Sequence, residues 1–186
     1  MAERDPLTLL HEAIAGALRD GLGARWRIEP IPWPMTVDEL QQLIKKAPVA
    51  AVAFTGFRPD GGGRVLSGEA QFAVLVIVTS TKLPERFLGS TAAPGLYRGV
   101  MAAAKAVHGL TVTGLGSLAA GEIRQSYSDG YGSLQLALGV VPVTTHVVVG
   151  DVLGWEGDLS EFDSLATTWP TAPGAPTDDI TLPVGG

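Results

Sequence analysis

The clearest nominal match to a chemical site is the spacing G-x-G-x-x-A formed by Gly114, Gly116 and Ala119. In dinucleotide-binding domains this spacing lets the backbone approach a pyrophosphate, inside a parallel strand-turn-helix unit with an acid about 20 residues later. Here Gly121 interrupts the following segment, which then continues into polar, strand-like residues. A loop between strands is therefore the favoured interpretation. A small-molecule or nucleotide-binding α/β domain using residues 114–119 stays open as the alternative from a different class.

A second glycine cluster, Gly61 to Gly63 followed by Arg64, could in principle cradle a phosphate, because consecutive glycine amides form anion nests. The cluster lacks the Lys-Ser or Lys-Thr ending of a phosphate-binding loop and separates two apolar runs. It is more typical of a hairpin tip.

The remaining reactive residue types form no recognisable site. His11, His108 and His146 show none of the spacings of zinc ligands, and no G-x-S-x-G surrounds a serine. The chain has no cysteine, which excludes disulfides, cysteine-ligated metals and thiol catalysis. The sequence therefore predicts no catalytic residue, no cofactor and no metal ion, and we expect the protein not to be an enzyme.

Composition and charge limit the class of protein. The 186 residues are 46% hydrophobic and 17% charged, which is ordinary for a folded domain and excludes wholesale disorder. The net charge is -6 and the longest basic cluster is Lys45-Lys46, so tight nucleic-acid binding is disfavoured. The N-terminus is too charged for a signal peptide and too interrupted to span a membrane, so we expect a soluble protein.

The elements are organised around residues 48–80, where two apolar runs, 49–57 and 70–79, flank the glycine-rich connection. This pattern is typical of a long antiparallel hairpin. In the second run the apolar residues fall on both faces, Phe72, Val74, Val76 and Val78 on one and Ala73, Leu75 and Ile77 on the other. A strand of this kind is expected in the middle of a sheet with both faces covered.

The rest of the chain adds helices and strands to this hairpin. Apolar spacing predicts helices over residues 5–22 and 95–108, and a capping box at Thr36 and Glu39 opens a helix over 37–46. Residues 25–31 read as a short strand, 82–93 as a loop, and the stretch 133–150 as strand that Pro142 either splits or confines to a sheet edge. We therefore predict an α+β fold, with a mainly antiparallel sheet flanked by two to three helices, over residues 1–150.

Residues 151–186 change character and are expected to form an extended, acidic, proline-rich C-terminal arm. Trp155, Phe162 and Trp169 recur there at intervals of seven, and such aromatics are good anchors in a neighbour's pocket. Folding back onto their own domain is the equally weighted alternative. The second candidate contact is the hairpin tip, where the charged residues are Arg58, Asp60 and Arg64.

The order of these elements resembles the Mu-like gp37 family, which is grouped with the tail terminators of long-tailed phages. The resemblance covers residues 7–149. It is carried by the helix 7–22, the strand entry Ala47-Pro48-Val49-Ala50-Ala51-Val52 ending in Phe54-Thr55-Gly56, the glycine-rich connection, the strand 71–78, and the helix 95–108 followed by Gly109-Leu110.

The resemblance implies a virion structural protein assembled in the host cytoplasm and located at the head-proximal end of the tail. It implies a homo-oligomeric, hexameric ring that caps the tail tube protein, stops its polymerisation and contacts the head-tail connector. DNA would pass through the lumen without specific binding, and an acidic lumen would repel its phosphates. Another head-tail completion protein or minor tail ring protein is the alternative within this class.

Overall fold

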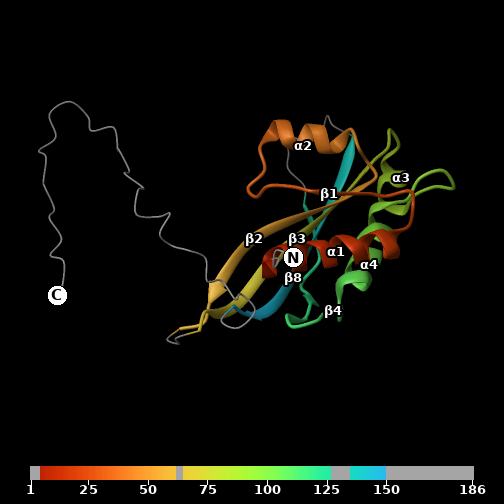
Figure 1. Ribbon diagram of the computed structural model, residues 1–186. Helices are drawn as coiled ribbons and strands as arrows, with labels where there is room; N and C mark the ends of the chain where they lie inside the picture. Colours follow the sequence, from red (N-terminus) through yellow and green to blue (C-terminus); the bar gives the residue numbers. More distant parts are fainter. Residues whose placement is uncertain (1–4, 62–64, 127–134, 150–186) are drawn as a thin grey trace, which may run out of the picture. The chain divides into compact units, whose positions relative to one another are not determined.

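The computed structural model describes residues 5–61, 65–126 and 135–149. Their main feature is a six-stranded sheet in the order β1-β2-β3-β8-β6, with β7 also paired to β8 (Figure 1). Its long strands are β2 (Val49–Pro59), β3 (Ser67–Thr79) and β8 (Leu136–Val148), and its short ones are β1 (Arg27–Pro30), β6 (Ala119–Ala120) and β7 (Arg124–Ser126). All pairs are antiparallel except β1 with β2, which confirms the mainly antiparallel α+β prediction.

The predicted central hairpin is formed by β2 and β3, in a register that pairs Val49 with Ile77 and Pro59 with Gly68. A bulge between Phe54 and Gly56 interrupts the register once. Both faces of β3 are buried as the sequence pattern predicted, because each alternate set of side chains belongs to a different hydrophobic cluster.

The larger cluster lies between the sheet and two helices, α1 (Pro6–Leu22) and α4 (Leu96–Val107). These helices lie next to each other in Figure 1. Asp5 caps α1, because its carboxylate accepts the Thr8 N–H at 2.9 Å and the Thr8 hydroxyl. The hydrogen bonds from Thr8 hold the pKa of Asp5 below its ordinary value.

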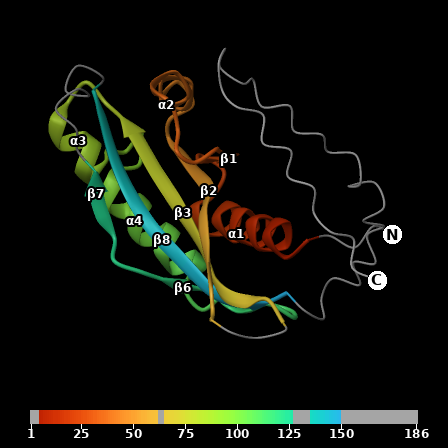
Figure 2. The same cartoon turned by 90° about the vertical axis from the view of Figure 1, so that its left-hand side faces the viewer.

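The smaller cluster covers the opposite face of the sheet at one end. Leu40 and Leu43 of α2 (Val37–Ile44) pack there on Val49, Ala51, Ala73, Leu75 and Ile77. The predicted capping box is present: Glu39 Oε2 accepts the Thr36 N–H at 2.7 Å, and Thr36 Oγ1 accepts the Glu39 N–H at 3.3 Å. Figures 1 and 2 both show α2 apart from α1 and α4.

Pro142 does not split β8, which runs unbroken for 13 residues. The residue lies where β6 has ended and β7 has not begun, so no ladder partner on that side requires its missing N–H. Its carbonyl accepts the Gly121 N–H at 2.8 Å. The splitting interpretation is therefore wrong, and Pro142 occupies a locally open edge, as the other interpretation predicted.

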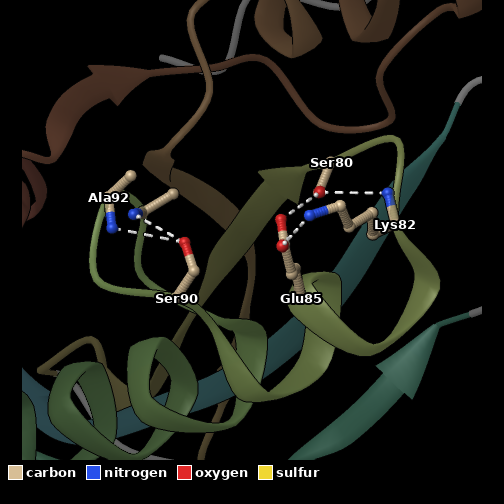
Figure 3. A network of polar contacts seen from close by, with 6 residues as sticks. Ser80, Lys82, Glu85, Ser90 and Ala92 are labelled. Carbon is tan, nitrogen blue, oxygen red and sulfur yellow. Dashed lines mark hydrogen bonds and ion pairs between the residues drawn. The ribbon is translucent and has the colours of Figure 1, made fainter.

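The loop predicted for residues 82–93 is wrong in its first half, which forms α3 (Leu83–Leu88). Pro84 lies in the first turn of this helix, where proline is tolerated because the missing N–H would have no partner within the helix. Figure 3 shows Glu85 accepting hydrogen bonds from the Ser80 hydroxyl at 3.1 Å and from Lys82 Nζ at 3.0 Å. These contacts with Ser80 and Lys82, which follow the end of β3, stabilise a helix too short to be visible as a sequence period.

Candidate subunit interface

The hairpin end of the sheet extends past the helices that cover it. At about 3.3 Å per residue the 13 residues of β3 span roughly 43 Å. The 17 residues of α1 and 12 of α4 span only about 26 Å and 18 Å at 1.5 Å per residue. Figure 2 shows β2, β3 and β8 continuing beyond both helices. We call this part of the molecule, comprising residues 57–60, 65–69 and 146–148, the sheet end.

Apolar side chains are exposed at the sheet end. Leu66 is 53% exposed, Val65 45% and Val148 43%. The two segments that carry them lie side by side, because the Val149 N–H donates to the Leu66 carbonyl at 2.7 Å. Exposed apolar groups gathered at one projecting end are typical of a protein–protein contact.

Charged side chains cross the same end in a row over three strands. Arg58 Nη2 lies 3.3 Å from Glu69 Oε1, its cross-strand neighbour. His146, opposite Glu69 on β8, places Nε2 2.7 Å from Asp60 Oδ2, and the Ser67 hydroxyl donates to the same oxygen at 3.0 Å. These pairs are solvent-exposed, so they set the alignment of the strand ends and add little stability.

The hydrogen bond to His146, followed by that from Ser67, lowers the pKa of Asp60 from its ordinary value of 3.8. Because the pKa of Asp60 is lower in the folded than in the unfolded state, its ionised carboxylate stabilises the fold above pH 3.8. This stabilisation is lost as the pH falls through the folded-state pKa.

We predict that His146→Gln raises the pKa of Asp60 more than Ser67→Ala does, because the hydrogen bond to His146 is the larger cause of the lowered pKa. Carboxyl NMR titration measures both. An unchanged titration in His146→Gln would contradict the contact.

Two of the six contact residues predicted from the sequence, Arg58 and Asp60, thus lie in one row. Each forms an ion pair within the same chain, Arg58 with Glu69 and Asp60 with His146. Arg64, Trp155, Phe162 and Trp169 lie outside the described residues. Sequence reasoning missed Val65, Leu66 and Val148, because Val65 and Leu66 belong to the connection in the sequence and Val148 looks like one more residue of an apolar strand.

A second exposed apolar surface lies on α3 and α4. We call it the α3–α4 patch. It contains Leu88, which is 73% exposed, Met101, which is 62% exposed, and Leu83 and Tyr97, which are also exposed. Phe87 and Tyr97 join the two helices with ring centroids 5.7 Å apart. The sequence carried a signal for this patch, since Tyr97 and Met101 are four residues apart and lie off the buried stripe of α4.

The outer edge of β2 is also available for pairing. β1 pairs with β2 only as far as Val52, and within the described residues no strand pairs with Ala53–Pro59 on that side. A groove of about 720 Å³ adjoins this edge, between α1 and a floor that includes Phe54 and Phe72. Open strand edges are templates for pairing with another chain.

The glycine motif at Gly114 and Gly116 forms the turn between β4 (Thr111–Val112) and β5 (Gly116–Ser117), which are antiparallel. Both glycines have φ near +80°, a backbone conformation that favours glycine. Thr145 anchors this hairpin by donating to the carbonyls of Leu115 and Ser117. The segment that follows is strand β6, so the motif has the loop context that the sequence favoured.

The three histidines have separate surroundings. His146 pairs with Asp60, His108 Nδ1 accepts the Ala120 N–H at 3.2 Å, and His11 lies in the groove beside β2, where burial lowers its pKa. Over residues 5–61, 65–126 and 135–149, no group of three or more acidic or histidine side chains is placed to hold a metal ion. None of the helices in this part of the chain is long and apolar enough to cross a membrane.

Comparisons with known proteins add a structural likeness. No family model matches the sequence, and no curated protein matches it. Among solved structures, the chain is similar to one from the "Virion of native gene transfer agent (GTA) particle". That chain is 11% identical, with a TM-score of 0.46 over 75% of this chain and 94% of that chain. A likeness at this level assigns neither family nor function.

Proposed function

We propose that this protein is a phage virion structural protein, a tail terminator that forms a ring on the tail tube and ends its polymerisation. The proposal joins the sequence resemblance to the Mu-like gp37 family with the distribution of exposed apolar surface. The observation that supports the proposal most directly is the projecting sheet end, where Val65, Leu66 and Val148 are exposed beyond the helices. In this proposal the protein acts by contact alone, without catalysis, cofactor or metal ion.

The two apolar surfaces favour a ring over a symmetric dimer. The sheet end and the α3–α4 patch are built from different elements, so a contact between them joins unlike surfaces of successive copies. Contacts of this head-to-tail kind close into rings when the rotation between copies divides a full turn. A six-membered ring, with the tail tube protein on one face and the head-tail connector on the other, is the assembly that we propose.

Tail length in virions that lack the gene tests the function. A terminator stops tube growth, so its loss is expected to give overlong tubes in electron micrographs. Normal-length tails without attached heads would instead favour the alternative of another head-tail completion protein. Normal tails on normal virions would contradict any role as a tail terminator.

A surface substitution tests whether the exposed apolar residues of the sheet end form a subunit contact. Leu66→Asp is expected to abolish tail termination, because a desolvated carboxylate opposes burial at a subunit contact. The stability of the purified protein should change by no more than about 0.5 kcal/mol, because Leu66 is exposed. Complementation of the gene deletion, scored by tail length, is the measurement.

The matched control is Val37→Asp, since Val37 is also exposed but lies in the first turn of α2, where a carboxylate suits the helix dipole. This variant should restore normal tails. Equal activity of both variants would show that the sheet end is not a contact.

A nucleotide-binding function remains the candidate from another class. Its fingerprint requires Gly114 and Gly116 to precede a helix, whereas here Gly116 begins strand β5 and strand β6 follows. Thermal shift with nucleotides tests it directly, and a large stabilisation would favour the nucleotide-binding function over the tail terminator.

A further inference from the structure

A compact pocket lies where the end of α1, the turn into β1 and the start of α4 meet. Its volume is about 400 Å³, within the range of roughly 300–1,000 Å³ typical of small-ligand sites. Trp26, Gly99 and Ala102 form part of its wall, and Arg25 and Arg98 line it from two different elements. We call it the arginine pocket.

Close backbone packing fixes the walls of this pocket. A Cβ atom at Gly99 would lie 2.6 Å from Trp26 Cη2, so the indole lies directly against the backbone of α4. A Cβ atom at Gly21 would lie 2.7 Å from Ala106 Cβ, so the end of α1 is held equally close to the same helix. The pocket is therefore preformed in the isolated chain, which lowers the entropy cost of filling it.

The charge of the pocket is positive. Arg25 and Arg98 are both exposed, and neither forms an ion pair with another described residue. No acidic side chain lines the cavity. Two guanidinium groups beside apolar walls suit an occupant with an apolar centre and carboxylates on both sides.

The chain itself contains a matching sequence. Residues 151–186 hold seven of the 19 acidic residues and none of the 13 basic ones, so residues 1–150 carry a net charge of about +1 and the acidic character lies in this segment. Within the whole sequence, Glu161-Phe162-Asp163 is the single place where an aromatic residue stands between two acids.

We propose that the arginine pocket receives Phe162 of a second copy of this chain, with Glu161 and Asp163 paired to Arg25 and Arg98. Phe162 would bury its ring against Trp26, and the carboxylates would set its orientation. This contact links successive copies in the proposed ring and in that sense rests on the proposed function.

The length of the intervening chain favours a second copy over the same one. The chain leaves the domain at Val149, beside Leu66, whereas Gly99 of the pocket adjoins Val76, ten residues further along β3. That separation is about 33 Å along the strand. The 13 residues from Val149 to Phe162 span at most about 45 Å, so reaching the pocket of the same copy uses roughly three quarters of that length before any detour around the helices.

Binding of a labelled synthetic peptide, residues 156–168, to the full-length protein tests the contact by fluorescence anisotropy. The Arg25→Glu/Arg98→Glu protein should bind about 30-fold more weakly or worse, because attraction becomes repulsion. A peptide carrying Glu161→Lys and Asp163→Lys should bind this variant and not the wild type. The matched control is Lys45→Glu/Lys105→Glu, which changes the same charge outside the pocket and should bind normally.

Equal binding to all three proteins, or the absence of binding to any, would overturn the proposal. At a concentration where the wild-type protein is monomeric, tight binding confined to a Phe162→Ala protein would show that each copy fills its own pocket, which overturns the assignment to a second copy. The peptide assay needs no tail tube, so its failure leaves the tail-length test of the terminator function intact. Likewise, normal tails in the deletion would not affect the binding measured with the peptide.

Discussion

Replacing Gly95 with alanine is expected to lower the free energy of unfolding by about 3 kcal/mol, the upper end of what overpacking costs. A Cβ atom at this position would lie 2.2 Å from Gly89 N and 2.4 Å from Leu88 C. Both are backbone atoms, so no side chain can rotate to make room, and α3 must move away from α4. Urea denaturation followed by circular dichroism measures the loss.

Gly16→Ala is the matched control, because Gly16 lies inside α1 and a Cβ atom there meets nothing within 4 Å. Alanine is the better helix former by about 1 kcal/mol, so this variant should be more stable than the wild type. If Gly95→Ala proved as stable as Gly16→Ala, the close contact between residues 89 and 95 would be wrong. The α3–α4 patch would then lack its support.

Leu18→Ala is expected to cost about 4 kcal/mol. Leu18 is fully buried in the cluster between α1, α4 and the sheet, where large-to-small changes cost about 2–5 kcal/mol. The upper part of that range applies because the contact of Gly21 with Ala106 already holds the end of α1 against α4, so the helix cannot move in to close the cavity. Thermal unfolding with calorimetry checks the value.

Leu9→Ala and Leu83→Ala calibrate this prediction. Leu9 lies on the same helix and is half-buried, so its truncation should cost about 1 kcal/mol, while exposed Leu83 should cost almost nothing. A Leu18→Ala cost no larger than that of Leu9→Ala would show that α1 does relax toward α4.

If the proposed contacts hold, each copy offers four surfaces at once: the sheet end, the α3–α4 patch, the open edge of β2 and the arginine pocket. In that case the sheet end contacts the α3–α4 patch of the next copy, and the arginine pocket receives Phe162 of a second copy. Both contacts join unlike parts of successive copies, which suits a closed ring. The expected acidic lumen then depends on where the acidic segment 151–186 goes, because residues 1–150 are close to neutral. Carboxylates engaged with Arg25 and Arg98 would not be available to repel DNA.

Local physics made much of the fold predictable. The Asp5-Pro6 helix start, the Thr36–Glu39 capping box and the apolar period of α4 depend on neighbours within four residues, and each is present. The two-faced apolar pattern of β3 correctly predicted a central strand, because period-2 alternation directly reports which faces are buried.

What the sequence by itself determined was therefore the type of most elements and the central hairpin. Only the tertiary structure decided the parallel pairing of β1, the open edge at Pro142 and the overhang of the sheet. These depend on contacts between residues far apart in the chain, such as Gly121 with Pro142 and Leu66 with Val149. Exposure at the sheet end followed from the lengths of strands relative to helices, a comparison that no local pattern contains.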